Sequence, residues 1–156
     1  MVNLADYQAF IAAQMQIPTT ALPPNSPTIL TTLAVAKSLV NPALCIADSC
    51  PDLSLGYIGP GIYEFAVYNL AGDLLVNFAQ DQPGQTYFFD LRKSLNINNF
   101  VPGLISESHD ETTGESLLNQ EFMKTLTMSD LQRMKTPWGR QYLMFAQSYG
   151  TLLGVS

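Results

Sequence analysis

The only histidine of the chain is its most obvious candidate for chemistry. His109 is followed by Asp110 and Glu111 in the run SHDETTG, and an imidazole beside carboxylates can bind a metal or transfer a proton when further groups converge on it. The spacing of the sequence supplies no such groups, so we expect a solvated turn here. The patterns HExxH and GxSxG and the phosphate-binding P-loop do not occur either. The sequence therefore predicts no catalytic residue, no metal and no cofactor, and a protein that is not an enzyme.

Cys45 and Cys50 are the only cysteines, spaced C-x4-C in the run PALCIADSCPD. Two thiols are too few for a structural zinc site, which takes four ligands. A disulfide fits across such a turn but is unusual in a reducing cytosol. The favoured interpretation is two unpaired, mostly buried thiols, with a disulfide and then a metal as the alternatives.

Gly56, Gly59 and Gly61 precede a predicted helix, and backbone amides at a helix N-terminus can bind an anion. The proline among them removes one donor, and the spacing is not that of a dinucleotide-binding loop. We therefore expect a tight turn rather than a phosphate site. Within the helix that follows, Glu64 and Asp73 are nine residues apart and do not share a face closely enough to act as a carboxylate pair.

The most acidic stretch lies in residues 103–118, GLISESHDETTGESLL. Apolar and polar residues alternate on both sides of Thr-Thr-Gly, which is typical of a β-hairpin. Such a run of carboxylates is usually a solvated loop. In a closed ring of subunits, however, it would line an aqueous channel or its rim and offer passing DNA no cation to bind. The candidates for such channel-facing residues are Glu107, Asp110, Glu111 and Glu115.

Two helices with clear start signals are predicted in the first forty residues. Asn3 is the expected N-cap of a helix that ends near Gln16. Ser26, followed by Pro27 at the first helical position, begins another helix that ends near residue 40. The segment between these helices is rich in proline, which favours an extended connection.

The strongest helical pattern of the chain covers residues 61–80. These residues are apolar on most sides, so the helix must be covered on most sides, and we expect it to be central. Residues 87–95 predict a short amphipathic helix. Its inward-facing residues are expected to be Phe88, Phe89, Leu91 and Leu95.

Three more helices are predicted after the hairpin. The first covers residues 119–126, and the second, through Lys135, follows a capping box formed by Thr127 and Asp130. A Thr-Pro pair then begins a final helix that ends near residue 149. This last helix carries an aromatic stripe, interpreted as core rather than as a ligand site, that consists of Trp138, Tyr142, Phe145 and Tyr149.

Together these elements predict a mainly α fold. We expect a small helical bundle around a long central helix, with a β-hairpin insertion and an extended C-terminal tail. Residues 1–150 are assigned to a single helical domain that includes the hairpin at 103–118. Residues 151–156, TLLGVS, form the tail, which carries no charge and whose expected partner-binding residues are Leu152, Leu153 and Val155.

The distribution of charge limits the possible functions. Seven Lys and Arg against thirteen Asp and Glu give a formal net charge of −6, the wrong sign for gripping phosphates, so no specific binding of nucleic acid is expected. Residues 7–63 contain only three charged side chains, Lys37, Asp48 and Asp52, which predicts a first half largely covered by other protein. No segment offers the roughly 20 consecutive apolar residues of a membrane span. The N-terminus also lacks the pattern of a secretory signal, so we expect a protein made in a cytoplasm and not bound to a membrane.

Three runs of the sequence resemble a known class of proteins. AVYNLAGDLLVNF, GLISESHDETTGESLL and LTMSDLQRMKTPWGRQYLMFAQSYG together resemble the head-to-tail connector, or adaptor, proteins of tailed phages and prophages in size and in order of elements. The resemblance implies a homo-oligomeric ring, usually of twelve copies, bound beneath the portal protein with each C-terminal tail laid along the portal. It also implies tail or nozzle proteins as further partners, and the virion neck between capsid and tail as the location.

Other interpretations stay open at this point. The chain fits a different virion component, such as a tail-tube terminator or a capsid-associated protein, and it fits a soluble helical binding module. A small enzyme with an unrecognised site is a further alternative, which would require a deep pocket with strongly perturbed carboxylates.

Overall fold

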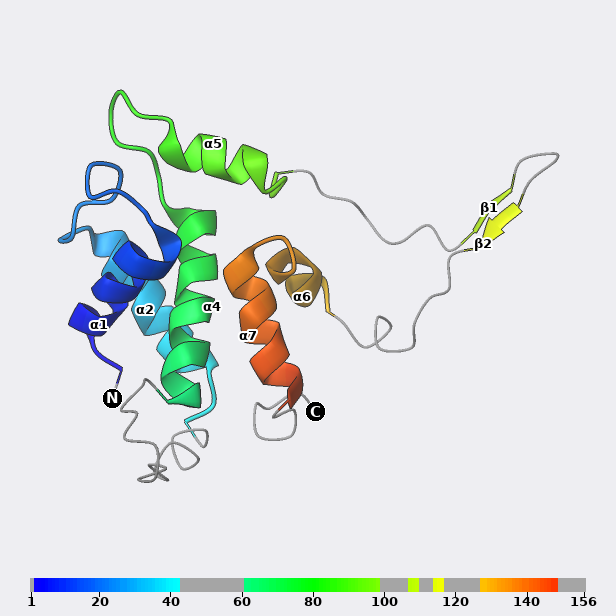
Figure 1. Cartoon of the computed structure of the whole chain (residues 1–156), viewed down its shortest axis with the longest axis horizontal. Coiled ribbons are helices and arrows are strands. Elements are labelled where there is room, and N and C mark those ends of the chain that lie inside the picture. The colour runs from blue at the N-terminus through cyan, green and yellow to red at the C-terminus, as the bar shows by residue number, and fades with distance from the viewer. Residues whose placement is uncertain (1, 43–60, 99–106, 110–113, 117–126, 149–156) are drawn as a thin grey trace.

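The structure of this chain, a computed structural model, is organised around one long helix, α4 (Ile62–Phe78). It describes residues 2–42, 61–98, 107–109, 114–116 and 127–148, and these are mainly helical (Figure 1). Helices α2 (Pro27–Leu39) and α7 (Pro137–Ser148) both pack along α4. Also described are α1 (Leu4–Phe10), which continues as a π-helical turn (Ile11–Met15), α5 (Tyr87–Ser94) and α6 (Met128–Arg133).

The first two helices begin where the sequence predicts. The Asn3 Oδ1 atom accepts a hydrogen bond from the Asp6 amide at 2.8 Å, so Asn3 caps α1. The π-helical turn ends at Gln16, which takes the left-handed conformation with φ of 54°. Ser26 occupies the N-cap position of α2, although its side chain makes no cap hydrogen bond, and Pro27 lies in the first turn. Local signals of capping and proline geometry therefore set these boundaries.

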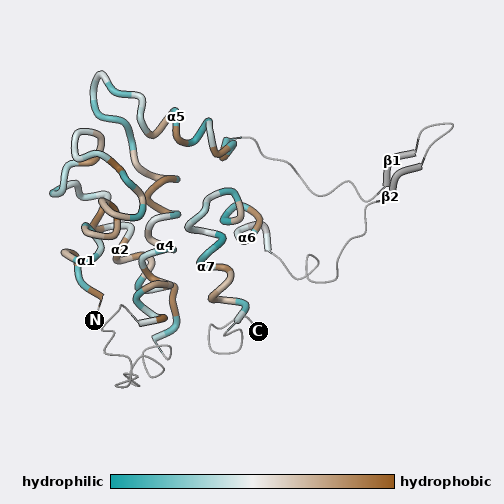
Figure 2. The backbone as a smooth tube through the Cα atoms, viewed as in Figure 1, coloured by the Kyte–Doolittle hydropathy of each residue, from teal (hydrophilic) through white to brown (hydrophobic). Residues whose placement is uncertain are grey.

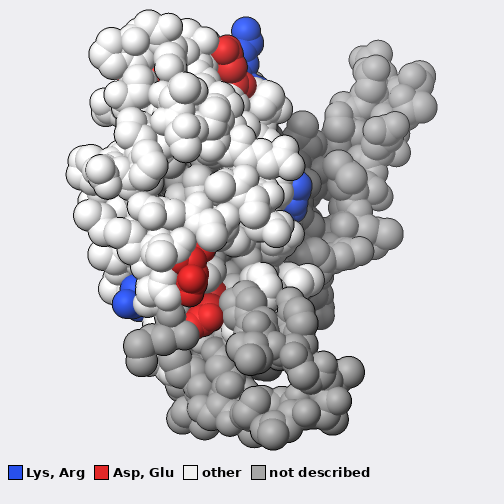
Figure 3. Space-filling view, turned by 60° about the vertical axis from the view of Figure 1, so that its left-hand side comes forward, with Lys and Arg blue, Asp and Glu red and all other residues white. Residues whose placement is uncertain are grey.

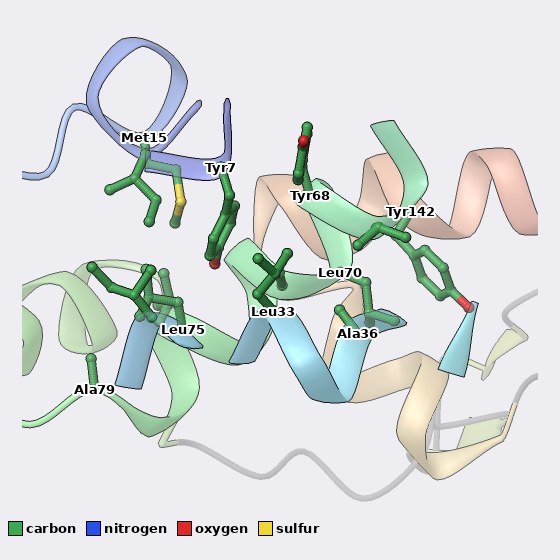
Figure 4. Close-up of a cluster of buried hydrophobic side chains, with 14 of the residues drawn as sticks. Tyr7, Met15, Leu33, Ala36, Tyr68, Leu70, Leu75, Ala79 and Tyr142 are labelled. Carbon is green, nitrogen blue, oxygen red and sulfur yellow. The ribbon is translucent and has the colours of Figure 1, made fainter. Parts of the chain in front are cut away.

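The core lies where α1, α2 and α7 meet α4, as the apolar segments in Figure 2 indicate. Tyr7 points from α1 toward Leu33 and Leu75 (Figure 4), and its ring stacks on that of Tyr68 at 5.8 Å between centroids. Helix α4 is buried over most of its circumference, as its all-round apolar pattern predicts. Its fully buried side chains include Val67, Asn69, Leu70, Leu75 and Val76.

Helix α5 corrects one prediction. Phe88 is fully buried and Leu91 and Leu95 are half-buried, as expected, but Phe89 is 55% exposed. Positions 88, 91 and 95 follow each other at spacings of three and four and share one face, whereas position 89 is turned about 100° away from it. The assignment of Phe89 to the inward face was therefore wrong, because an eight-residue helix that packs on one side can bury only one stripe.

The capping box predicted before α6 is present. The Asp130 amide donates to Thr127 Oγ1 at 3.3 Å, and Asp130 Oδ2 accepts from the Thr127 amide at 2.9 Å. Helix α6 ends at Arg133 rather than at Lys135, and Thr136 and Pro137 then begin α7 as predicted. The predicted helix over residues 119–126 lies outside the described residues.

A short antiparallel ladder joins β1 (Glu107–His109) to β2 (Gly114–Ser116). Its register pairs Ser108 with Glu115. Both strands fall within residues 103–118, for which the sequence predicts a hairpin. The residues that connect them and flank them are outside the described part of the chain.

Among the helices that the structure describes, none combines the length and the apolar character that crossing a bilayer requires.

Candidate interaction surface

An apolar groove runs between α2 and α4. It has a volume of about 520 Å³. Helix α2 supplies one wall through Thr28, Thr31 and Val35, and the C-terminal part of α4 supplies the other through Leu74 and Phe78. We call it the α2–α4 groove, and its lining consists of Pro27, Thr28, Thr31, Thr32, Val35, Leu74 and Phe78.

Helix α2 is apolar on several sides, and α1 and α4 cover only some of them. Ile29, Leu33 and Ala36 face the core, while Leu30 and Leu39 remain more than half exposed. On α4 the last residue, Phe78, is 66% exposed. Val35, which also lines the groove, is 40% exposed, and exposed apolar side chains that line a groove are typical of surfaces that other proteins cover.

The surface around the groove carries very little charge. From residue 7 to residue 36 the chain has no charged side chain. Figure 3, which brings the α1 and α2 side forward, shows a broad white face with only a few acidic and basic residues. Interface cores are depleted in charged residues in the same way, because burying an unpaired charge is costly.

Asp73 is a buried carboxylate of structural importance that the sequence pattern does not predict. It is 3% exposed, and its Oδ1 atom accepts a hydrogen bond from Thr136 Oγ1 at 2.5 Å. The Thr136 hydroxyl in turn accepts the Gly139 amide at 2.9 Å, so this hydroxyl caps α7 while donating to α4. Burial raises the pKa of Asp73 to about 6, although the hydrogen bond from Thr136 and the Arg133 charge oppose the rise.

The packing of α7 explains the burial that raises the pKa of Asp73. A Cβ atom added to Gly139 would lie 2.9 Å from Asp73 Oδ1 and 2.1 Å from the carbonyl oxygen of Arg133, so the start of α7 is packed directly against this carboxylate. Among the described residues no three His, Cys, Asp or Glu side chains gather as metal ligands would. Asp73 therefore joins two helices, and nothing around it in the described part of the chain completes a catalytic arrangement.

The aromatic stripe of α7 is only partly core. Tyr142 is buried and lies under the Arg133 guanidinium, 5.3 Å from its ring centroid. Trp138 and Phe145 are half-buried, which corrects the expectation that the whole stripe is core. Trp138 packs against the core with part of its surface and also lines a second pocket, described below. Tyr149 lies outside the described residues.

The register of the ladder separates two of the acidic candidates. Residues in an antiparallel ladder alternate between its faces, so positions 107 and 115, paired with Ser116 and Ser108, occupy opposite faces. Asp110 and Glu111, the other two predicted channel-facing residues, are outside the described part of the chain.

Several other predicted sites also fall on residues that the structure does not describe. They are both cysteines, Cys45 and Cys50, the glycines Gly56 and Gly59, and the tail residues Leu152, Leu153 and Val155. Gly61, the last of the glycine series, is the N-cap residue of α4.

The chain was compared with known families, with curated proteins and with solved structures, and nothing matches in any of the three comparisons.

Proposed function

We propose that this chain is a structural subunit of a protein assembly, the head-to-tail adaptor ring of a tailed phage. The observation that carries the proposal is the uncharged α2–α4 groove with Phe78 exposed at its edge. The adaptor assignment itself comes from the sequence resemblance, and it names the neighbours: further copies of the chain, the portal protein, and tail or nozzle proteins. The place of action is then the virion neck.

The energetics favour covering the groove with protein. Fully burying a phenylalanine side chain is worth about 1.5–3 kcal/mol, and Phe78 of the groove lining is 66% exposed. Hot spots of interfaces are aromatic side chains packed into desolvated pockets. A partner that fills the groove therefore gains apolar contact without having to desolvate a charge from this side.

The net negative charge of the chain favours a subunit that lines a DNA passage without binding the DNA. The net charge of −6 leaves few cations with which to displace the counterions of DNA. The hairpin carboxylates Glu107, Asp110, Glu111 and Glu115 stay candidates for a channel wall.

The test uses two exposed phenylalanines as a matched pair. Phe78→Ser removes the aromatic edge of the groove, and Phe89→Ser makes the same change on α5, away from the groove. Each variant is co-expressed with the portal protein of the same phage genome and examined by negative-stain microscopy. We expect rings on the portal from the unaltered chain and from Phe89→Ser, and loss of rings from Phe78→Ser.

Folding of both variants is checked by circular dichroism, and melting temperatures close to that of the unaltered chain are expected because both side chains are largely exposed. An unaltered chain that does not bind the portal would contradict the adaptor assignment. Equal ring formation by both variants would show that the groove is not the binding surface.

A further inference from the structure

A second pocket lies at the junction of α1, α4 and α7. Its volume is about 450 Å³. Three aromatic side chains, Phe10, Phe65 and Trp138, provide its apolar surface, and amide side chains lie beside them. We call it the Trp138 pocket, lined by Phe10, Gln14, Phe65, Asn69, Pro137, Trp138 and Gln141.

Among the described residues, one buried polar atom in the lining of this pocket lacks a hydrogen-bond partner. Asn69 is 1% exposed, and its Nδ2 group donates to the Phe65 carbonyl at 2.9 Å. Its Oδ1 atom is buried and has no partner among the described residues. Buried polar atoms are nearly always hydrogen-bonded, so Asn69 Oδ1 is an acceptor that an N–H group of another molecule would satisfy when the side chains over it move aside.

The lining selects a neutral ligand. Aromatic faces next to amide groups, without charge, are the surfaces that bind uncharged peptide segments, and proline rings in particular dock into aromatic grooves. Carboxylates, phosphates and ammonium groups would lose hydration here without gaining a partner of opposite charge among the lining residues.

The chain itself presents a segment of this kind. In the connection between α1 and α2, Pro23, Pro24 and Asn25 are all exposed and uncharged. Their backbone is already held in place, because Gln8 Nε2 donates to the Pro24 carbonyl at 2.8 Å and the Ser26 amide donates to the Pro23 carbonyl at 2.9 Å. A segment that is ordered before binding loses little conformational entropy when it binds.

The segment and the Trp138 pocket lie on different sides of the molecule. Gln8, which holds the segment, and Phe10, which lines the pocket, are two positions apart on α1 and so point about 160° away from each other around the helix. Figure 1 shows the connection, in blue, at the outer edge of the helical body. A copy of this chain can therefore offer its segment to one neighbour and its pocket to another.

We propose that residues Pro23, Pro24 and Asn25 of one copy enter the Trp138 pocket of the next. The proline rings pack on the aromatic side chains, and the Asn25 amide donates to Asn69 Oδ1. Because the two surfaces differ, the contact is head-to-tail, and such contacts generate rings when the rotation closes. The inference rests on the proposed function and deepens it by naming the contact between neighbouring subunits.

The test is a mixing experiment on the full chain. The pocket variant, Gln14→Glu with Gln141→Glu, places charge at exposed rim positions of the pocket, and the segment variant, Pro23→Glu, places charge on the entering loop. A control variant, Gln82→Glu with Gln85→Glu, adds the same charge as the pocket variant in the turn before α5. Sedimentation velocity over micromolar to millimolar concentration measures self-association, and fluorescence of Trp138, the only tryptophan, reports on the pocket.

We expect the unaltered chain and the control to self-associate, and the pocket and segment variants each to do so at least ten-fold more weakly. Mixed together, these two variants still have one intact pocket and one intact segment between them. The mixture should therefore form a 1:1 heterodimer and no larger species, with a shift in Trp138 emission on mixing. A contact between identical surfaces would not produce this result.

Three outcomes would overturn the inference: an unaltered chain that stays monomeric to millimolar concentration, variants that associate as the control does, or a mixture without the heterodimer. Ring formation on the portal is measured separately. Rings that form on the portal from the pocket and segment variants would leave the adaptor function standing while removing this contact.

Discussion

At the scale of single residues, a buried carboxylate joins two helices of the bundle. Asp73 of α4 accepts a hydrogen bond from the Thr136 hydroxyl, and that hydroxyl accepts a hydrogen bond from the Gly139 amide at the start of α7. A negative group near a helix N-terminus is favourable, yet the burial of this carboxylate disfavours its ionised form and raises its pKa to about 6. The hydrogen bond from Thr136 thus joins α7 to α4, while the burial of the carboxylate makes the folded state less stable when Asp73 is ionised.

This balance predicts how stability depends on pH. The pKa of Asp73 lies near 6 in the folded state, against an ordinary value of 3.8. Between pH 4 and pH 6 the folded chain therefore retains a proton that the unfolded chain has lost, so the free energy of unfolding falls as pH rises through this window and then levels off. The contribution of this group to that fall is about 2–3 kcal/mol.

Asp73→Asn should remove this contribution. The amide oxygen of asparagine still accepts from Thr136, and the side chain has nearly the same shape, so the variant should be at least as stable as the unaltered chain at pH 7. Urea unfolding followed by circular dichroism at pH 4, 5, 6 and 7 measures the difference between the two proteins. Parallel stability curves would contradict the prediction.

At the scale of elements, hydrogen bonds from two polar side chains hold α5 against the end of α4 and the segment that follows it. Asp81 accepts the amides of Phe88 and Phe89 at 2.6 and 2.9 Å, which satisfies N–H groups that the first turn of a helix leaves free. Arg92 reaches back from α5 and donates to the carbonyl oxygens of Asn77 and Ala79. The direction of α5 thus depends on these contacts as well as on the burial of Phe88.

Asp81→Ala should loosen α5 without unfolding the bundle. Loss of a helix cap costs about 1 kcal/mol, and we expect faster amide hydrogen exchange in α5 with little change in α4. Gln85→Ala is the control, because it truncates an exposed side chain in the same turn and leaves Asp81 and the Thr86 hydrogen bond to Asp90 in place. Equal exchange rates in α5 for the two variants would show that Asp81 does not hold this helix.

At the scale of the whole molecule, two hollows have no charged residue in their lining: the α2–α4 groove and the Trp138 pocket, to which α7 also contributes. Association through such a surface depends on apolar burial, which salt does not screen. Contacts between exposed charges, by contrast, weaken as the Debye length falls from about 10 Å at 0.1 M salt to 3 Å at 1 M.

Self-association should therefore be nearly independent of salt. We expect the association constant to change by less than about two-fold between 0.1 M and 0.5 M sodium chloride, measured by sedimentation velocity. Sodium sulfate at equal ionic strength should strengthen the association, because sulfate favours apolar burial. Association that weakens ten-fold in sodium chloride would assign the contact to charged residues instead.

The sequence by itself determined where the described helices begin and that the fold is mainly helical. Asn3, Ser26 with Pro27, and the Thr127–Asp130 capping box were readable because a cap is made by residues within one turn of each other. The all-round apolar pattern of α4 likewise identified the central helix. The adaptor function, the twelve-copy ring and the roles of the hairpin and tail residues are predictions of the sequence that stay predictions.

Only the tertiary structure decided which apolar side chains are buried and which polar ones lie in the core. Helical spacing separates Phe88 from Phe89, and the structure shows which of the two faces is covered: Phe88 is buried and Phe89 is 55% exposed, because α5 meets α4 along one side. Asp73 is buried because Thr136, 63 residues away, lies against it. The α2–α4 groove and the Trp138 pocket likewise combine residues that are distant in the chain. Their physical basis is contact between separate helices, which local sequence patterns do not encode.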